Sequence, residues 1–294
     1  MAYLENRPFA IMLTSLLGAD GRPATKEELH QLIQSLLHAD WETEESPIRL
    51  KGDLKLEQVA AARFFDQSRV FLRALAEDRG VSLTALGRIN RAGVLRLIER
   101  MAWPRAAAEF ARKVFHSKQF NEPDIEPLHH IRIVCECGKL TIKRRGRLLA
   151  TKQAAALCAD AQAGWLFRRL FIAFFQCFNL DYLSGFPATP FVQQSLGVIL
   201  WRLSLTANDW IAAGKLPREV FLPRVSGQIT QLDTWPDAEA GVLVLKVLEP
   251  LCWFGLLEGD TRDDDYDRRF GSQKYRKTPL FDQFLSFSAG RGRR

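Results

Sequence analysis

A dense group of basic side chains in the middle of the chain has the composition of a phosphate-binding surface. Six cations fall within fourteen residues: Lys139, Lys143, Arg144, Arg145, Arg147 and Lys152. Lys and Arg bind nucleic-acid backbones because they neutralise phosphates and release the counterions condensed on them. We therefore predict that these six residues contact the phosphates of DNA. The alternative is a solvated basic turn that binds nothing.

Histidine and cysteine residues just before this basic group raise the question of a metal site. The candidate ligands are His129, His130, Cys135 and Cys137. Both residue types bind zinc, but the cysteines form Cys-x-Cys rather than Cys-x-x-Cys, and no second pair follows. Their apolar neighbours favour small core residues instead. We expect no metal here, and these four residues remain the candidates of a metal-dependent alternative.

Motifs of covalent and nucleotide chemistry are absent from the sequence. It contains no Gly-x-Ser-x-Gly, no Gly-x-x-x-x-Gly-Lys and no His-Glu-x-x-His. The acidic run from Glu258 to Asp267 lacks the spacing of a calcium-binding loop, and Arg262 and Arg268 are interleaved with its carboxylates. We expect a protein that is not an enzyme and needs no cofactor.

The whole composition is that of a globular protein with an anionic partner permitted but not required. The 294 residues are 47% hydrophobic and carry a formal net charge of +7. The most apolar stretch, Trp165 to Leu180, contains Arg168 and Arg169 and is too short to cross a bilayer. Five cysteines without a preceding secretory leader predict a cytoplasmic protein with no membrane partner.

The elements around the basic group predict a β-hairpin between two helices. A helix is expected to end near Gly138, and Lys139 to Lys143 should form a strand with Leu140 and Ile142 on one face. A tight turn, a returning strand and a second helix complete the pattern, at 144–147, 148–151 and 152–158. Helix, strand, basic turn, strand and helix is the layout of a winged-helix wing.

A second copy of this layout is predicted near the end of the sequence. The expected helix, first strand, charged connection, returning strand and second helix are 242–253, 254–258, 259–272, 273–278 and 279–285. Thr151 and Thr278 occupy equivalent positions, where a hydroxyl can cap the following helix. The predicted fold is therefore mainly α with short β-hairpins, a helical protein containing two winged-helix-like units.

Three regions are expected along the chain. They are an N-terminal helical region at 1–120, a first winged-helix-like unit with an aromatic helical core at 121–240, and a second unit with a basic tail at 241–294. In the first region, Leu56 to Ala76 should form two helices, with Asp66 near the second start. Thr25 and Glu28 predict a capping box.

Four stretches carry a family resemblance: Leu83 to Arg91, Gly146 to Leu148, Phe178 to Leu183, and Lys277 to Asp282. Together they resemble a bacterial family of uncharacterised proteins, some attached to a plasmid-type open-reading-frame domain of unknown function. The resemblance spans the chain from about Leu56 onward. It implies winged-helix-like structure and no catalytic residue. One departure is Lys152-Gln153, where the family pattern has Lys or Arg followed by Gly, so the helix start can differ here.

Three functional hypotheses follow. The leading one is a non-enzymatic protein that binds duplex DNA or regulates something bound to it, with phosphate contacts from the basic wing. The second is a protein-interaction scaffold, because winged-helix folds also serve as docking surfaces. The third is the metal-dependent enzyme, using His129, His130 and the two nearby cysteines.

Overall fold

The computed structural model describes residues 25–101, 121–183, 187–232, 235, 237–260 and 270–288. This part of the chain is mainly helical with small antiparallel sheets, which confirms the predicted class. Among the described helices, none is long and apolar enough to cross a membrane. Parts of the predicted N-terminal helical region, at 1–24 and 102–120, most of the acidic run and the basic tail lie outside the described residues.

The chain divides into two compact units, which are described separately. The central unit is residues 52–178, and the terminal unit combines residues 1–51 with 179–294. These boundaries differ from the three consecutive regions expected from the sequence. The terminal unit is discontinuous because β1 (Ile48–Leu50) pairs antiparallel with β8 (Leu285–Phe287). A pairing between the two ends of a chain leaves no trace in local sequence patterns.

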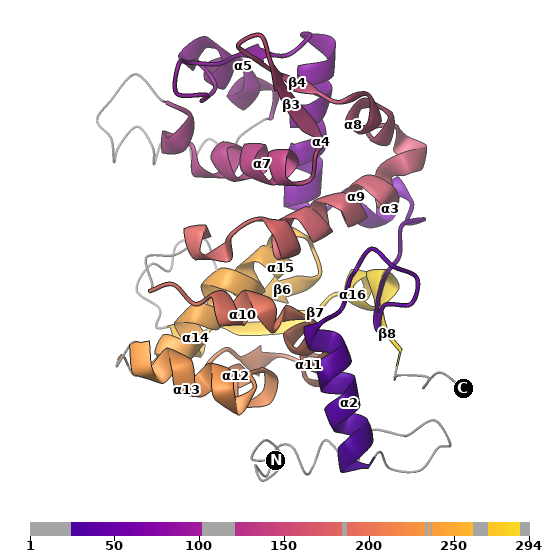
Figure 1. The fold of residues 1–294 in the computed structure, drawn as a ribbon, viewed down its shortest axis with the longest axis vertical. Coiled ribbons are helices and arrows are strands. Elements are labelled where there is room, and N and C mark those ends of the chain that lie inside the picture. Colours follow the sequence, from indigo (N-terminus) through magenta and orange to yellow (C-terminus); the bar gives the residue numbers. More distant parts are fainter. Residues whose placement is uncertain are drawn as a thin grey trace. The chain divides into compact units, whose positions relative to one another are not determined.

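The central unit contains short helices around one three-stranded sheet (Figure 1). In Figure 1, α4, α5 and α7 gather around the sheet, whose strand order is β2-β4-β3. Its elements are α3 (Leu56–Val59), α4 (Arg63–Glu77), β2 (Val81–Ser82), α5 (Arg91–Arg100), η2 (Glu122–Asp124), α7 (Glu126–Cys137), β3 (Thr141–Arg144), β4 (Arg147–Ala150), α8 (Lys152–Leu157), η3 (Asp160–Gln162), α9 (Ala163–Ile172) and η4 (Ala173–Cys177). The two helices predicted within 56–76 are present, but the break falls before Arg63 rather than near Asp66.

The core of the central unit is built on α9 and η4, as the aromatic sequence there predicts. Phe167, Phe171 and Phe174 are completely buried, and the Phe174 ring meets the edge of Phe64 at 5.1 Å between centroids. Gly164 lies against the backbone of the segment before α3. A Cβ on Gly164 would lie 2.4 Å from the Leu54 nitrogen, so only glycine allows α9 to pack this closely.

The terminal unit has a second three-stranded sheet, of order β5-β7-β6, and the β1–β8 pair. Its elements are α2 (Lys26–Leu37), β1, η5 (Leu180–Leu183), α10 (Pro190–Gln194), α11 (Leu196–Thr206), β5 (Ile211–Ala212), α12 (Leu216–Val220), α13 (Pro223–Leu232), α14 (Ala238–Leu243), η6 (Val244–Leu248), α15 (Glu249–Trp253), β6 (Leu257–Gly259), η7 (Phe270–Ser272), β7 (Lys274–Lys277), α16 (Pro279–Phe284) and β8. The capping box of α2 is confirmed, because Glu28 N donates to Thr25 Oγ1 and Thr25 N to Glu28 Oε2.

Both predicted helix–hairpin–helix arrangements are present, and their strands pair in the same register. Thr141 pairs with Ala150 in the central unit, and Leu257 pairs with Lys277 in the terminal unit. The helix caps differ. Thr151 Oγ1 accepts a hydrogen bond from Ala154 N at 3.1 Å, as predicted for a cap. The same prediction for Thr278 is wrong, because its hydroxyl donates to the Gly255 carbonyl at 2.6 Å instead.

Candidate functional site

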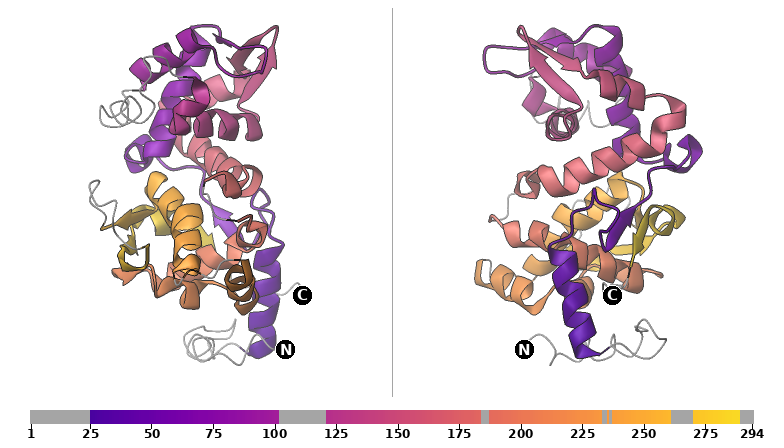
Figure 2. Two further views of the ribbon diagram at one scale, coloured as in Figure 1. Left: turned by 90° about the vertical axis from the view of Figure 1, so that its left-hand side faces the viewer. Right: turned by 45° about the vertical axis from the view of Figure 1, so that its right-hand side comes forward.

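The basic group predicted from the sequence forms the β3–β4 hairpin, which lies at the periphery of the central unit (Figure 2). The closing pair is Arg144 and Arg147, joined by a turn of only two residues, Arg145 and Gly146. Both turn residues are left-handed, with φ of 50° and 70°. This is the backbone of a type I′ turn, whose twist matches that of the two strands it joins. The predicted tight turn is therefore confirmed.

The predicted face of the first strand is wrong. The sequence pattern places Leu140 and Ile142 on one face of the strand, but Leu140 is buried and Ile142 is 53% exposed. Leu140 precedes β3, and its N–H donates back to the Cys135 carbonyl at the end of α7. The chain reverses at Lys139, whose φ is 56°, so the alternation of faces begins one residue later than the sequence pattern suggests.

The six predicted phosphate contacts fall into two groups. Four side chains are exposed, and within the described residues they make no ion pair and no side-chain hydrogen bond; they are Lys139, Arg144, Arg145 and Lys152. Arg147 instead donates to the carbonyls of Arg79 and Gly80, at 3.1 and 2.7 Å. It thereby stabilises the segment before β2. Lys143 pairs with Glu136 of α7 at 3.2 Å. Four of the six cations are thus available to a ligand.

Left-handed backbone concentrates at cationic residues of this sheet. Among the described residues, the non-glycine residues with positive φ are Arg79, Lys139 and Arg145. Each adjoins a strand of the β2-β4-β3 sheet. Gly255 of the terminal unit is equivalent to Lys139, because each lies two residues before the first paired residue of its hairpin. Gly255 is also left-handed, with a φ of 67°. A side chain in this conformation costs about 1 kcal/mol that glycine avoids.

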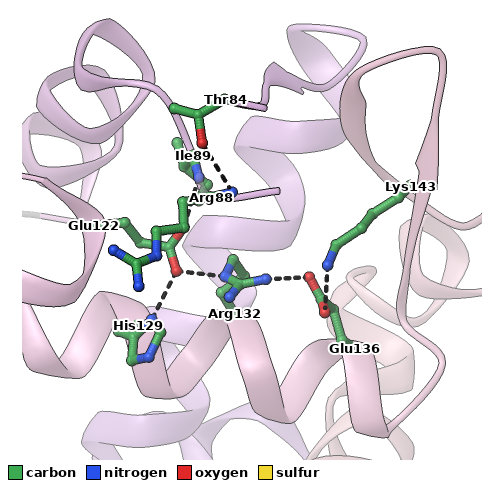
Figure 3. Close-up of polar contacts among 8 residues, drawn as sticks. All are labelled: Thr84, Arg88, Ile89, Glu122, His129, Arg132, Glu136 and Lys143. Atoms are coloured by element: carbon green, nitrogen blue, oxygen red, sulfur yellow. Dashed lines mark hydrogen bonds and ion pairs between the residues drawn. The ribbon is translucent and has the colours of Figure 1, made fainter. Parts of the chain in front are cut away.

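A chain of polar contacts connects the inside of the unit to the hairpin (Figure 3). It begins at Glu122 of η2, whose side chain is completely buried. Glu122 accepts hydrogen bonds from Ile89 N at 2.6 Å and Arg132 Nε at 2.5 Å, and His129 Nδ1 lies 2.7 Å from its carboxylate. Burial raises the pKa of this carboxyl, but the contacts with His129, Ile89 N and Arg132 outweigh it, so the pKa lies below its ordinary value.

The chain of polar contacts then continues along α7. Arg132 Nη1 donates to Glu136 at 2.5 Å, and the other oxygen of Glu136 faces Lys143 of β3. Charges alternate along the whole path, so each polar side chain on this side of α7 is paired within the unit. The sequence gives no indication of Glu122, because Asn121 to Asp124 resembles an ordinary loop. Its partner Ile89 lies 33 residues away.

The candidate metal ligands do not form a binding site in the described part of the chain. No group of three or more His, Cys, Asp or Glu side chains there is placed to hold a metal ion. His130 is buried, and burial together with the charge of His129 lowers its pKa to about 4. Burial raises the pKa of both Cys135 and Cys137. Raised pKa values keep these thiols protonated at neutral pH.

The second hairpin has one exposed cation without a side-chain partner among the described residues, Lys274, and its other described charged side chains are paired or hydrogen-bonded. Glu258 accepts a hydrogen bond from Arg276 Nε at 2.6 Å, and Arg276 stacks on Trp210 with 4.7 Å to the ring centroid. Asp260 occupies the register position that Arg144 has in the first hairpin, and it accepts a hydrogen bond from Lys274 N. The described part of this hairpin therefore offers no comparable surface to an anion.

Residues 60–163 match the Y4jL N-terminal domain, a protein family of unknown function. The match covers about a third of the chain and includes α4, the β2-β4-β3 sheet and the basic hairpin. No curated protein and no solved structure matches the chain. The comparison supports an uncharacterised protein family for this segment, and it places the basic hairpin within the domain that the family defines.

Proposed function

We propose that the central unit is a winged-helix unit that binds duplex DNA without catalysing a reaction. Its described elements include, in order, α4, β2, α5, η2, α7, β3 and β4, and the first strand lies beside the last. Helix, strand, two helices and a hairpin, with this strand order, is the connectivity of winged-helix folds. In this proposal the β3–β4 hairpin is the wing, and the protein acts in the cytoplasm.

The four available cations carry the proposal. Lys139, Arg144, Arg145 and Lys152 are exposed, and the described residues provide no carboxylate to neutralise them. Two of them hold left-handed backbone, where glycine would be more stable. Strained positions of this kind concentrate at functional sites. We therefore expect the cations in these strained positions to bind a ligand, and phosphate is the ligand that clustered Lys and Arg bind best.

The test is the salt dependence of binding to a labelled duplex, measured by fluorescence anisotropy. Four phosphate contacts predict a slope of log K against log salt of about −3.6. The variant Arg144→Gln/Arg145→Gln should reduce the slope to about −1.8. Arg49→Gln/Arg218→Gln is the matched control, since both residues are exposed and belong to the terminal unit. Equal slopes for the wild type and the hairpin variant would contradict the proposal.

A protein-docking function is the second candidate, because large apolar side chains are exposed on the same unit. Leu86 is 81% exposed, and Ile142 is 53% exposed on the hairpin itself. Exposed apolar side chains beside cations favour a protein surface over a phosphate backbone. Purification from the native host distinguishes the two candidates: a scaffold brings a stoichiometric protein partner and no nucleic acid.

A further inference from the structure

Helix α7 immediately precedes the hairpin, where a winged-helix protein that reads bases places its recognition helix. The polar side chains of α7 are engaged within the unit. We infer that the central unit binds duplex DNA through the phosphate backbone alone, so that its affinity does not depend on base sequence. This inference rests on the proposed DNA-binding function and specifies the class of DNA that the same hairpin recognises.

The first argument is the burial of α7. Arg132 is 7% exposed and His130 is 4% exposed, although arginine and histidine are the side chains on this helix best suited to contact base edges. In α7, the exposed residues are Glu126 and Pro127, at the first turn. A helix that reads bases must present several donors and acceptors to the groove, and α7 does not.

The second argument is the energetic consequence of extending Arg132 toward a base. Its guanidinium pairs with Glu122, whose carboxylate is completely buried. Breaking this pair would leave an uncompensated charge inside the unit, and that penalty exceeds the gain from one base contact. His129 contacts the same carboxylate and is subject to the same restriction.

The third argument is the charge of the accessible part of α7. The most exposed charge of α7 is the Glu126 carboxylate, with 70% of its side chain exposed, and it would repel a nearby phosphate. Glu136 is 27% exposed and already paired with Arg132 and Lys143, so it offers phosphate no attraction. The cations of the hairpin attract the same phosphates, and phosphate contacts carry no direct sequence information.

The experiment compares three labelled duplexes of equal length, with AT-rich, GC-rich and mixed sequences and without A-tracts, whose narrow minor groove would add shape effects. Dissociation constants within about threefold of one another, with a common salt slope, are expected, because sequence-specific binding exceeds non-specific binding by about a thousandfold or more. Hydrogen exchange should show protection by DNA at residues 139–152 and none along α7.

Two different failures can be told apart. A preference of about tenfold or more for one duplex, or protection of α7 by DNA, contradicts the inference while the proposed function stands. Absence of salt-dependent binding to every duplex contradicts the proposed function, and the inference falls with it. The Arg144→Gln/Arg145→Gln variant provides the control, because it should weaken binding to the three duplexes equally.

Discussion

The two hairpins of this protein pair their strands in the same register and differ in surface charge. Lys143 pairs with Leu148 in the first, and Gly259 pairs with Tyr275 in the second, at the same place in the register. Leu148 and Tyr275 are both buried, so the core side of each hairpin fixes its register. The outer side is free to vary. The exposed cations of the first hairpin are therefore not required by the fold, which favours a role for them in binding.

The hairpins also differ in how they are connected to their units. The first is joined through Lys143 and Glu136 to a buried carboxylate, Glu122. The second carries a partly exposed pair between Glu258 and Arg276. A buried network depends on every member, whereas an exposed pair contributes little. This contrast predicts that the same chemical change has very different effects in the two units.

The largest effect is expected from the removal of Glu122. Glu122→Ala removes the buried carboxylate that pairs with Arg132 and accepts from Ile89 N. It should lower the free energy of unfolding of the central unit by about 3 to 5 kcal/mol, although Arg132 keeps its second partner, Glu136. The matched change Glu258→Ala should cost at most about 1 kcal/mol, because its pair is partly exposed and solvent screens it. Urea unfolding followed by hydrogen exchange in each unit measures both losses. Similar losses would show that the two carboxylates are equivalent after all.

The next largest effect is a pH dependence confined to the central unit. His130 is buried with its pKa lowered from 6.5 to about 4, and the exposed Glu126 carboxylate 3.9 Å away does not offset that burial. The unfolded chain takes up the proton first, so stability is full above pH 6.5 and decreases as the pH falls toward 4. The expected loss is about 3 kcal/mol.

His130→Phe should remove this part of the pH dependence. It replaces the imidazole, which packs against Phe178, with an aromatic ring that does not titrate. Thermal unfolding of both proteins between pH 7 and pH 4 gives the comparison. An unchanged pH profile in the variant would mean that other groups cause the loss.

A smaller effect is expected where Lys139 and Gly255 take the same backbone conformation. Lys139→Gly should stabilise the central unit by up to about 1 kcal/mol, because glycine relieves the strain of the left-handed backbone. The higher conformational entropy that glycine gives the unfolded chain offsets part of this gain. The same change should weaken DNA binding and reduce the salt slope by about 0.9. A stabilised variant with undiminished binding would indicate that Lys139 does not contact phosphate.

The smallest effect is a gain in binding. Glu136→Gln keeps the hydrogen-bonding capacity of the side chain but removes the charge that neutralises Lys143. The lysine then becomes available to phosphate, so the salt slope should steepen by about 0.9 and the affinity should rise several-fold. Anisotropy titrations at two salt concentrations detect the change. Weaker binding would indicate that Glu136 orients the hairpin and that its charge does not compete with the ligand.

Local features of this fold were predictable because each depends on residues close in sequence. The capping box at Thr25, the cap at Thr151 and the two-residue turn at Arg145 all follow from side chains within three positions of one another. The failures at Ile142 and Thr278 have a common cause. In each case the cause is a residue just after the preceding helix. Lys139 changes the direction of the chain before Ile142, and Gly255 supplies the carbonyl that accepts the Thr278 hydroxyl.

The long-range contacts could not be predicted. Arg147 donates to carbonyls 67 and 68 residues away, and Glu122 to Ile89 spans 33 residues. Nothing in the spacing of basic residues distinguishes Arg147 from Arg144, although one supports the backbone and the other is exposed. Burial and partner choice depend on tertiary packing, which a pattern of residue types does not encode.

The pairing of β1 with β8 has a consequence for the order of events during synthesis. The central unit is complete once residue 178 has left the ribosome, so it can fold while the rest of the chain is still being made. The terminal unit must wait for Leu285 to Phe287, because β1 has no strand partner until then. During synthesis the nascent chain therefore contains a folded central unit, flanked by the two segments of a terminal unit that cannot yet fold completely.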